Sequence, residues 1–178
     1  MKEQELNTCE SNSLHVAFQE SLELLEWPKI CEQLSTFATT PQAKRNSREP
    51  PMPADIASSR QCLLETIEIA ALDQNLDGGL NFEGVKDIEN LVWRCSKKGT
   101  LSGEELLSIA ETLRSSRRLR RQIEDPINRP ELSALLEDLA TLPDLERTLV
   151  SGLEEGGRVA DRASPKLNEL RRHLNSLR

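Results

Sequence analysis

The stretch RVADRASPKLNELRRHLNSLR, residues 158–178, decides the fold. Ser164 and Pro165 predict a helix start, because a serine oxygen can accept from free N–H groups and proline suits the first helical turn. Four leucines follow at helical spacing: Leu167, Leu170, Leu174 and Leu177. Such a narrow seam is typical of a helix that packs against one partner helix. Because no glycine or proline stop follows, we expect the stretch to begin a long helix of a longer protein.

The seam also predicts how the two ends of this helix behave. Leu167 and Leu170 lie near the helix start, so we expect them to pack on the body of the domain. Leu174 and Leu177 come one and two turns later, where a partner helix would have to cover them.

The composition favours helices throughout the chain. Of the 178 residues, 37% are hydrophobic and 30% charged, whereas only 3% are aromatic and none is tyrosine. Leu, Ile and Ala must therefore fill the core, and this set suits helices better than sheets. The sequence predicts an all-α fold, an irregular domain of about seven to eight helices over residues 14–178. A flexible tail is expected at residues 1–13, which are polar.

Local signals predict where the helices begin and end. Helix starts are expected at Pro28, at Thr40-Pro41, after Asp55, at the capping box from Ser102 to Glu105, and at Pro143. Gly99 is the expected left-handed residue that ends the helix before it. Residues 155–157, Glu-Gly-Gly, predict a turn, and residues 159–160 a short extended piece.

Apolar periodicity predicts which helix faces are buried. On the helix after Pro28 the expected stripe is Ile30, Leu34, Phe37 and Ala38. On the helix after Asp55 it is Ile56, Leu63, Ile67, Ala70 and Ala71. On the helix after Ser102 it is Leu106, Ile109, Ala110 and Leu113.

The charge pattern leaves room only for local anion binding. A net charge of −7 argues against a general coat for nucleic acid. Two basic groups nevertheless stand out as candidate nucleic-acid contacts: Arg114, Arg117, Arg118 and Arg121, and, in the last helix, Arg171 and Arg172. The first four recur at helical spacing, which predicts that they line one face. The alternative for both groups is a solvated or ion-paired surface.

No metal site is expected. Residues 73–84 match a calcium-binding EF-hand loop at several positions, but Gly84 stands where the bidentate glutamate belongs. We therefore interpret this stretch as a turn. The four cysteines, Cys9, Cys31, Cys62 and Cys95, lie far apart without a paired motif, so a zinc site is not expected either. Three of them lie in helical patterns, which favours small core residues in a reducing cytosol.

Catalytic and membrane motifs are missing from the sequence. It contains no phosphate-binding loop, no dinucleotide fingerprint and no H-E-x-x-H pair, and His15 and His173 belong to no catalytic set. We expect no catalytic residue and no cofactor in this chain. A signal peptide and long apolar runs are also absent, so we expect a cytoplasmic protein without a membrane partner.

Three stretches in order resemble one protein family. The first is LLEWPKICEQL at residues 24–34, and the third is GRVADRASPKL at residues 157–167 running into Leu170-Arg171-Arg172. Between them lie GVKDI at 84–88, LSGEELL at 101–107 and Thr112-Leu113-Arg114. Together they resemble the amino-terminal part of the bacterial type-two MutS proteins, which end in an Smr domain. Pro28 departs from the family, where an acidic residue is more usual, but either residue fits a helix start.

The resemblance implies a mechanical role. In the MutS architecture this segment is the helical core and lever that connects an ATPase to a DNA clamp. The ATP and magnesium site, the clamp and the Smr endonuclease would lie beyond Arg178. The family's association with DNA repair, recombination suppression and ribosome quality control implies DNA or a ribosome as partner of the full protein, and the rest of the parent chain as partner of this segment.

Two other interpretations of the seam remain open. The chain could be a free-standing helical adaptor that binds a partner protein through the leucines. A second copy of the chain could also cover them, giving a homodimer.

Overall fold

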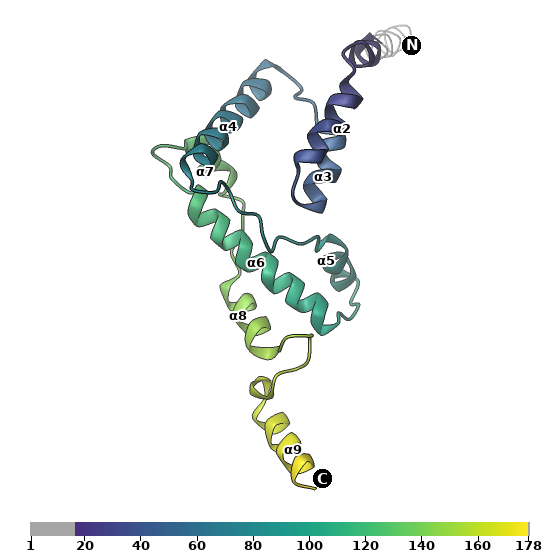
Figure 1. Cartoon of the computed structure of the whole chain (residues 1–178), viewed down its shortest axis with the longest axis vertical. Coiled ribbons are helices and arrows are strands. Elements are labelled where there is room, and N and C mark those ends of the chain that lie inside the picture. Colours follow the sequence, from purple (N-terminus) through teal and green to yellow (C-terminus); the bar gives the residue numbers. More distant parts are fainter. Residues whose placement is uncertain (1–16, 178) are drawn as a thin grey trace, which may run out of the picture. The chain divides into compact units, whose positions relative to one another are not determined.

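The computed structural model describes residues 17–177, and Figure 1 shows that these are almost entirely helical. In this described part, eight α-helices and one 3-10 helix follow a helical segment at residues 17–24, which confirms the prediction of an all-α fold with about seven to eight helices. The tail predicted for residues 1–13 lies outside the described residues. The chain divides into two compact units, Met1–Met52 and Pro53–Arg178.

The first unit is built from short helices. Residues 17–24 are helical, and α2 (Trp27–Phe37) and α3 (Pro41–Arg48) follow and pack on each other (Figure 1). Helix α2 has Pro28 in its first turn. Helix α3 begins as predicted, because the Thr40 hydroxyl accepts a hydrogen bond of 3.2 Å from the Ala43 N–H.

The buried face of α2 differs from the predicted stripe. Ile30, Leu34 and Phe37 are exposed, whereas Cys31 and Ser35 are buried. These two small residues lie one turn apart, and small side chains let a neighbouring helix come close. The predicted stripe was therefore wrong for its three large residues, whereas Ala38, just after α2, is half-buried. Because α2 packs on α3, the covered face is the one with small residues.

The second unit begins with a long helix that the sequence placed correctly. Helix α4 (Ile56–Asn75) starts where Asp55 Oδ1 accepts from the Ser58 N–H at 2.7 Å. Residues 76–88 form a loop between α4 and α5, which we call the glycine-rich loop. The helices after it are α5 (Glu89–Ser96), α6 (Gly103–Ile123), α7 (Pro130–Leu135), α8 (Pro143–Gly152), the 3-10 helix η1 (Asp161–Ala163) and α9 (Pro165–Ser176).

Helix α4 also buries a different face from the predicted one. Five residues of the predicted stripe are exposed: Ile56, Leu63, Ile67, Ala70 and Ala71. The buried face instead carries Leu72 and, one turn earlier, Glu68. The carboxylate of Glu68 accepts from the N–H groups of Glu131 and Leu132 at 3.3 and 2.9 Å, and so satisfies the free start of α7. Packing on α7 therefore sets which side of α4 is covered.

Helix α5 ends one residue earlier than its glycine suggests. Lys98, with φ of 62°, is the left-handed residue, and Gly99 is not. The Gly99 N–H donates to the Arg94 carbonyl at 2.9 Å, and the Lys98 N–H donates to Cys95. This is the hydrogen-bond pattern of a Schellman cap. A Cβ at position 99 would lie 2.9 Å from the Arg94 oxygen, so glycine is needed there for close approach.

Helix α6 is the central element of the second unit. Its capping box forms as predicted between Ser102 and Glu105. Ala110 is buried, and the other three residues of the predicted stripe, Leu106, Ile109 and Leu113, are half-buried. Helix α8 packs alongside α6 (Figure 1). The predicted turn after α8 also forms, with Gly156 and Gly157 at positive φ and an antiparallel bridge between Leu153 and Val159.

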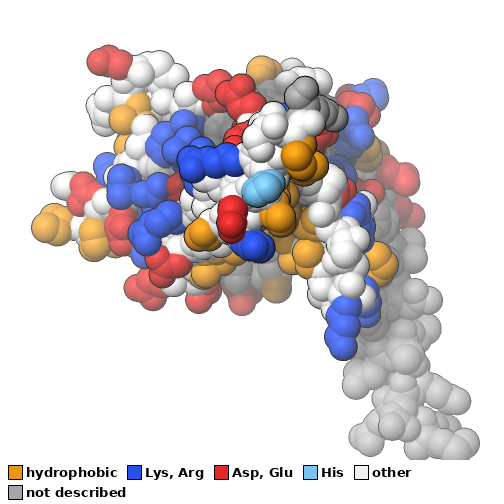
Figure 2. All heavy atoms as spheres, turned by 90° about the horizontal axis from the view of Figure 1, so that it is seen from below, with side chains coloured by type: hydrophobic (Ala, Val, Ile, Leu, Met, Phe, Trp, Pro, Cys, Tyr) orange, Lys and Arg blue, Asp and Glu red, His pale blue; other side chains and the backbone are white. Residues whose placement is uncertain are grey.

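Large apolar side chains remain on the surface, and Figure 2 shows them scattered among charged ones. Cys62 and Cys95 are exposed, so the prediction of core cysteines holds for Cys31 alone among the three that the structure describes. Cys9 lies outside the described residues. None of the helices in residues 17–177 is both long enough and apolar enough to cross a bilayer.

Candidate functional site

The predicted arginine face of α6 is divided between two neighbours. Arg117 donates to both carboxylate oxygens of Glu146 in α8, at 3.0 and 2.8 Å. Arg118 donates to the carbonyl of Glu83 in the glycine-rich loop at 2.7 Å. All four arginines lie within α6, and at about 100° per residue their positions span an arc of roughly 100°, so they share one side of the helix as predicted. They do not form one free basic surface, because Arg117 and Arg118 bond to different neighbours.

The remaining predicted arginines differ in how they are held. Arg171 in α9 donates to the Val159 carbonyl at 2.9 Å and pairs with Asp161, so it holds α9 against the preceding segment. Arg121 and Arg172 are exposed and bond to no residue in the described part of the chain. Arg114 is 69% exposed, with its Nε 3.8 Å from Glu146 Oε1.

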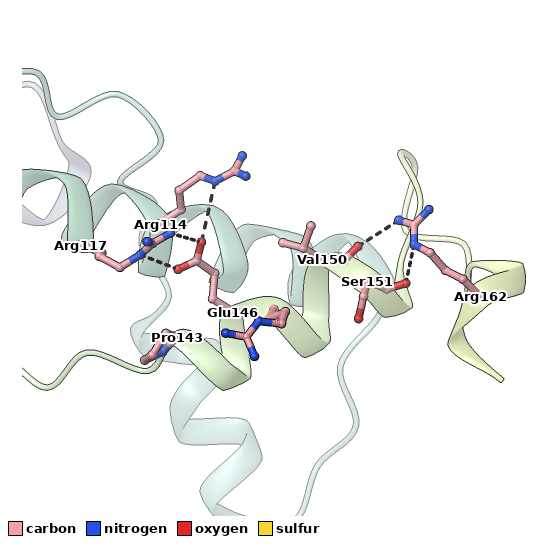
Figure 3. A pocket seen from close by; sticks show the side chains of 8 residues that line it. Arg114, Arg117, Pro143, Glu146, Val150, Ser151 and Arg162 are labelled. Carbon is pink, nitrogen blue, oxygen red and sulfur yellow. Dashed lines mark hydrogen bonds and ion pairs between the residues drawn. The ribbon is translucent and has the colours of Figure 1, made fainter.

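Four arginines line a cavity between α6, α8 and η1. Arg114 and Arg117 were predicted as candidates from the sequence, whereas Arg147 and Arg162 were not. The cavity has a volume of about 440 Å³. Its charged lining consists of Arg114, Arg117, Glu146, Arg147 and Arg162, four cations against one anion (Figure 3). The local charge is therefore positive in a chain whose net charge is −7.

Glu146 fixes the arginines of α6 at this cavity. Its side chain is only 9% exposed, and the two hydrogen bonds from Arg117 form a bidentate pair (Figure 3). Bidentate pairs between arginine and carboxylate are both strong and directional. Glu146 also lies in the first turn of α8, where the helix dipole favours a negative charge.

Arg162 closes the other end of α8. Its Nε donates to the Ser151 carbonyl at 2.8 Å, and its Nη2 donates to the Val150 carbonyl at 3.1 Å (Figure 3). The same Nη2 donates to the Leu153 carbonyl at 3.3 Å. The last carbonyls of a helix have no partner within the helix, and a cation there also complements the dipole. The remaining nitrogen, Nη1, bonds to no described residue.

Arg147 is a strongly exposed member of the cavity lining. Its only partner among the described residues is Asp144, at 3.2 Å, and the two side chains are 77% and 90% exposed. Sequence reasoning missed Arg147 and Arg162 because they come from segments separate from α6. The one signal in the sequence is that the turn at Gly156-Gly157 returns the chain, with Arg162, towards the end of α8.

The leucine seam on α9 is anchored at its start and open beyond it. Leu167 is half-buried, and exposure then rises through Leu170, Leu174 and Leu177 at 51%, 64% and 78%. The expectation that Leu170 packs on the domain was therefore wrong. Pro165 begins the helix as predicted, but the Ser164 side chain makes no capping hydrogen bond.

The glycine-rich loop is organised by its own hydrogen bonds. Asp73 Oδ1 accepts from the Leu80 N–H at 2.7 Å, and Ser115 Oγ of α6 donates to the Glu83 carbonyl at 2.8 Å. Within residues 17–177 no three His, Cys, Asp or Glu side chains are grouped as metal ligands. The absence of calcium binding stays a prediction. His173 lies exposed on α9, and His15 lies outside the described residues.

The sequence is similar to that of known proteins, although no protein-family model matches it. An endonuclease MutS2 of Synechocystis is 39% identical over 169 residues, which is 95% of this chain and 20% of the relative. Endonuclease MutS2 of Symbiobacterium thermophilum is 32% identical over 89% of the chain, and that of a Geobacillus strain is 32% identical over 87%. Both matches again cover 20% of the relative.

The resemblance noted in the sequence is thereby confirmed across nearly the whole chain. The chain spans about a fifth of the length of the curated relatives that it matches, and the match lies in their amino-terminal part. The chain belongs to the MutS2 family.

Proposed function

We propose that the chain is the helical core-and-lever segment of a MutS2 protein. In this role it links the ATPase to a clamp for DNA or the ribosome and carries no chemistry of its own. The observation that carries the proposal is helix α9, whose start is fixed to the second unit and whose leucines are increasingly exposed towards its end.

The attachment of α9 supports transmission of force. Arg171 reaches back to the Val159 carbonyl and to Asp161, so the first turns of α9 are tied to η1 and the bridge before it. Arg162 in turn ties η1 to the end of α8, which packs on α6. Movement of α9 would therefore be passed to α6 through side chains with defined partners.

The open leucines support a partner helix from elsewhere in the protein. Burying one leucine stabilises by roughly 1.5–3 kcal/mol, so Leu170, Leu174 and Leu177 together favour a partner strongly. The matched relatives are about five times as long as this chain, and their remaining sequence can supply such a helix. Two helices joined by a continuous seam form a stiff rod, as a lever requires.

The chemistry of the parent protein would lie outside this chain. ATP, magnesium and endonuclease residues belong to the other four fifths of a MutS2 protein under this proposal. We expect the isolated chain neither to hydrolyse ATP nor to cut DNA. Roles in recombination suppression, DNA repair or ribosome rescue would then belong to the whole protein, with this segment as the mechanical link.

A chimera tests the lever. The matched fifth of the Synechocystis relative is replaced by this chain, and ATP hydrolysis, DNA cleavage and the ATP dependence of DNA binding are measured. The seam variant carries Leu174→Glu and Leu177→Glu. We expect it to retain ATP hydrolysis but to lose the dependence of DNA binding on ATP, because the lever helices no longer pack.

The control is Leu135→Glu, the same change at an exposed leucine of α7. It should behave like the unmodified chimera. If the seam variant also matches the unmodified chimera in every measurement, the lever proposal is wrong. A free-standing adaptor that binds another protein through the leucines would then be favoured.

A further inference from the structure

We propose that the cavity between α6 and α8 is a binding site for a phosphate group of a nucleic-acid backbone. The site differs from the arginine face predicted from the sequence, because Arg147 and Arg162 belong to it and Arg118 and Arg121 do not. It also does not depend on the lever proposal, since no residue of α9 lines it.

The charge of the cavity supports an anionic ligand. Four arginines and one glutamate line it, and Glu146 is already engaged by Arg117 through both oxygens. Three guanidinium groups therefore keep nitrogens that no described residue uses: those of Arg114, Arg147 and Arg162. Guanidinium groups are the side chains that match phosphate oxygens best, through paired N–H donors.

The two ends of α8 make the site stable without a ligand. Glu146 holds Arg117, and Arg162 is held by the carbonyls of Val150 and Ser151 (Figure 3) and by that of Leu153. Their positions are therefore set before binding, which lowers the entropy lost when a ligand arrives. Arg114 and Arg147 are exposed and can close over a bound oxyanion.

The apolar part of the lining favours a backbone phosphate over a free nucleotide. Among the residues that the structure describes, Pro143 and Val150 are the only apolar side chains at this cavity, and none of its described lining residues is an aromatic one on which a base could stack. Recognition of a nucleotide normally adds contacts to the base, whereas backbone binding rests on phosphate contacts alone. A backbone ligand would bind without sequence preference and with strong salt dependence.

The test measures binding of short fluorescent single-stranded and double-stranded DNA and RNA to the 178-residue chain at two salt concentrations. The loss variant is Arg114→Glu with Arg147→Glu, two exposed side chains whose reversal should leave the fold intact by circular dichroism. We expect at least about tenfold weaker binding, because two charge-assisted contacts are lost. The salt slope should fall by about 0.7–0.9 for each lost phosphate contact.

Further variants sharpen the result. Asp144→Asn removes the exposed partner of Arg147 and should tighten binding about two- to fivefold, the range of a surface ion pair. The control Arg60→Glu reverses one exposed arginine of α4, so it is compared with Arg114→Glu alone, which makes the same charge change at the cavity. It should weaken binding much less than one reversal at the cavity.

The outcomes separate the sources of the phosphate. Inorganic phosphate and ATP are added as competitors. If either binds the cavity at least as tightly as the oligonucleotides do and displaces all of them equally, the ligand is a small phosphate. That result would overturn the nucleic-acid proposal. Equal losses in the cavity and Arg60 variants would mean that overall charge alone attracts nucleic acid. Binding of an acidic peptide in preference to all oligonucleotides would also overturn it.

Discussion

Gly103 and Gly157 approach each other so closely that a Cβ on Gly103 would lie 1.8 Å from the Gly157 carbonyl oxygen. A Cβ on Gly157 would in turn lie 2.4 Å from the Glu104 nitrogen, and the φ of Gly157 is +73°. The turn after α8 therefore rests directly on the first turn of α6. This contact fixes the turn between α8 and η1 against the start of α6.

We predict that Gly103→Ala and Gly157→Ala each lower the free energy of unfolding by about 1–3 kcal/mol. The physical reason is overpacking against backbone atoms, which cannot move aside as a flexible side chain can. Gly157→Ala adds the cost of a left-handed conformation, about 1–2 kcal/mol. Urea denaturation of each variant followed by circular dichroism gives the values.

Two other glycines serve as controls for this prediction. An added Cβ meets nothing within 4 Å at Gly156 or at Gly152. Gly156→Ala should cost only the left-handed conformation, because its φ is +79°. Gly152→Ala lies at the end of α8 and should be neutral or slightly stabilising, by up to about 1 kcal/mol. Equal effects at all four positions would show that close approach is not the cause.

Acid should weaken the start of α6 through Glu105. The pKa of Glu105 is lowered, first by the hydrogen bond from Arg94 and next by the backbone N–H of Ser102. A carboxyl with a lowered pKa in the folded state stabilises the fold at pH values above its unfolded pKa. This stabilisation disappears as the pH falls through the folded pKa. The pKa values of Asp55 and Asp125 are lowered as well, so these two carboxyl groups act in the same direction. We predict that the urea concentration at the midpoint of unfolding falls as the pH is lowered.

Glu105→Gln isolates the contribution of this residue. The variant should be less stable than the wild type at neutral pH, and the difference should shrink as the pH falls below the ordinary range of a glutamate. Glu111→Gln is the matched control, because Glu111 pairs only with Lys86 at the surface, at 2.5 Å. Such pairs contribute little. A difference for Glu105→Gln that stays constant with pH would refute the mechanism.

Calcium should leave the melting temperature of the chain unchanged. Asp73, the first expected ligand, already accepts a hydrogen bond from Leu80, and Gly84 stands where the last ligand belongs. A Cβ at position 84 would lie 2.5 Å from Ser115 Oγ of α6, and the φ of Gly84 is +82°, so a glutamate there would be strained. Thermal melts with millimolar calcium and with a chelator test this. A calcium-dependent rise of several degrees would contradict it.

Three helix starts were predictable from the sequence because their signals are local. The caps at Thr40 and Asp55 and the capping box at Ser102 each lie within four residues of the groups that they satisfy. The buried faces of α2 and α4 were not predictable, because each depends on which helix packs against it. Cys31 is buried on α2, which packs on α3, and Leu72 is buried on α4, which packs on α7. The apolar periodicity of one helix does not identify such a neighbour.

The candidate site was predictable only in part, for the same reason. Arg114 and Arg117 stand out in the sequence because they belong to one dense run on one helix. Arg162 reaches the same cavity from a segment 45 positions after Arg117, and only the folded turn brings it to the end of α8. Spacing along a helix also could not show that Arg118 turns away to the glycine-rich loop.

The open end of α9 gives the last prediction. Leu174 and Leu177 are exposed, so Leu174→Glu with Leu177→Glu should change the free energy of unfolding of the chain by no more than about 0.5 kcal/mol. Amides in the last turns of α9 should exchange rapidly, because an uncovered helix end frays. If the unmodified chain associates with itself through the seam, its sedimentation coefficient should be larger than that of the double variant.

Leu136→Glu provides the contrast, because Leu136 is buried and a carboxylate there would lose its water without gaining a partner. That variant should be destabilised by several times as much as the seam variant. The prediction fails if hydrogen exchange finds the end of α9 strongly protected in a strict monomer and the double substitution unfolds the chain. The leucines would then be covered within the chain itself, and α9 would be a core helix with no seam to offer a partner.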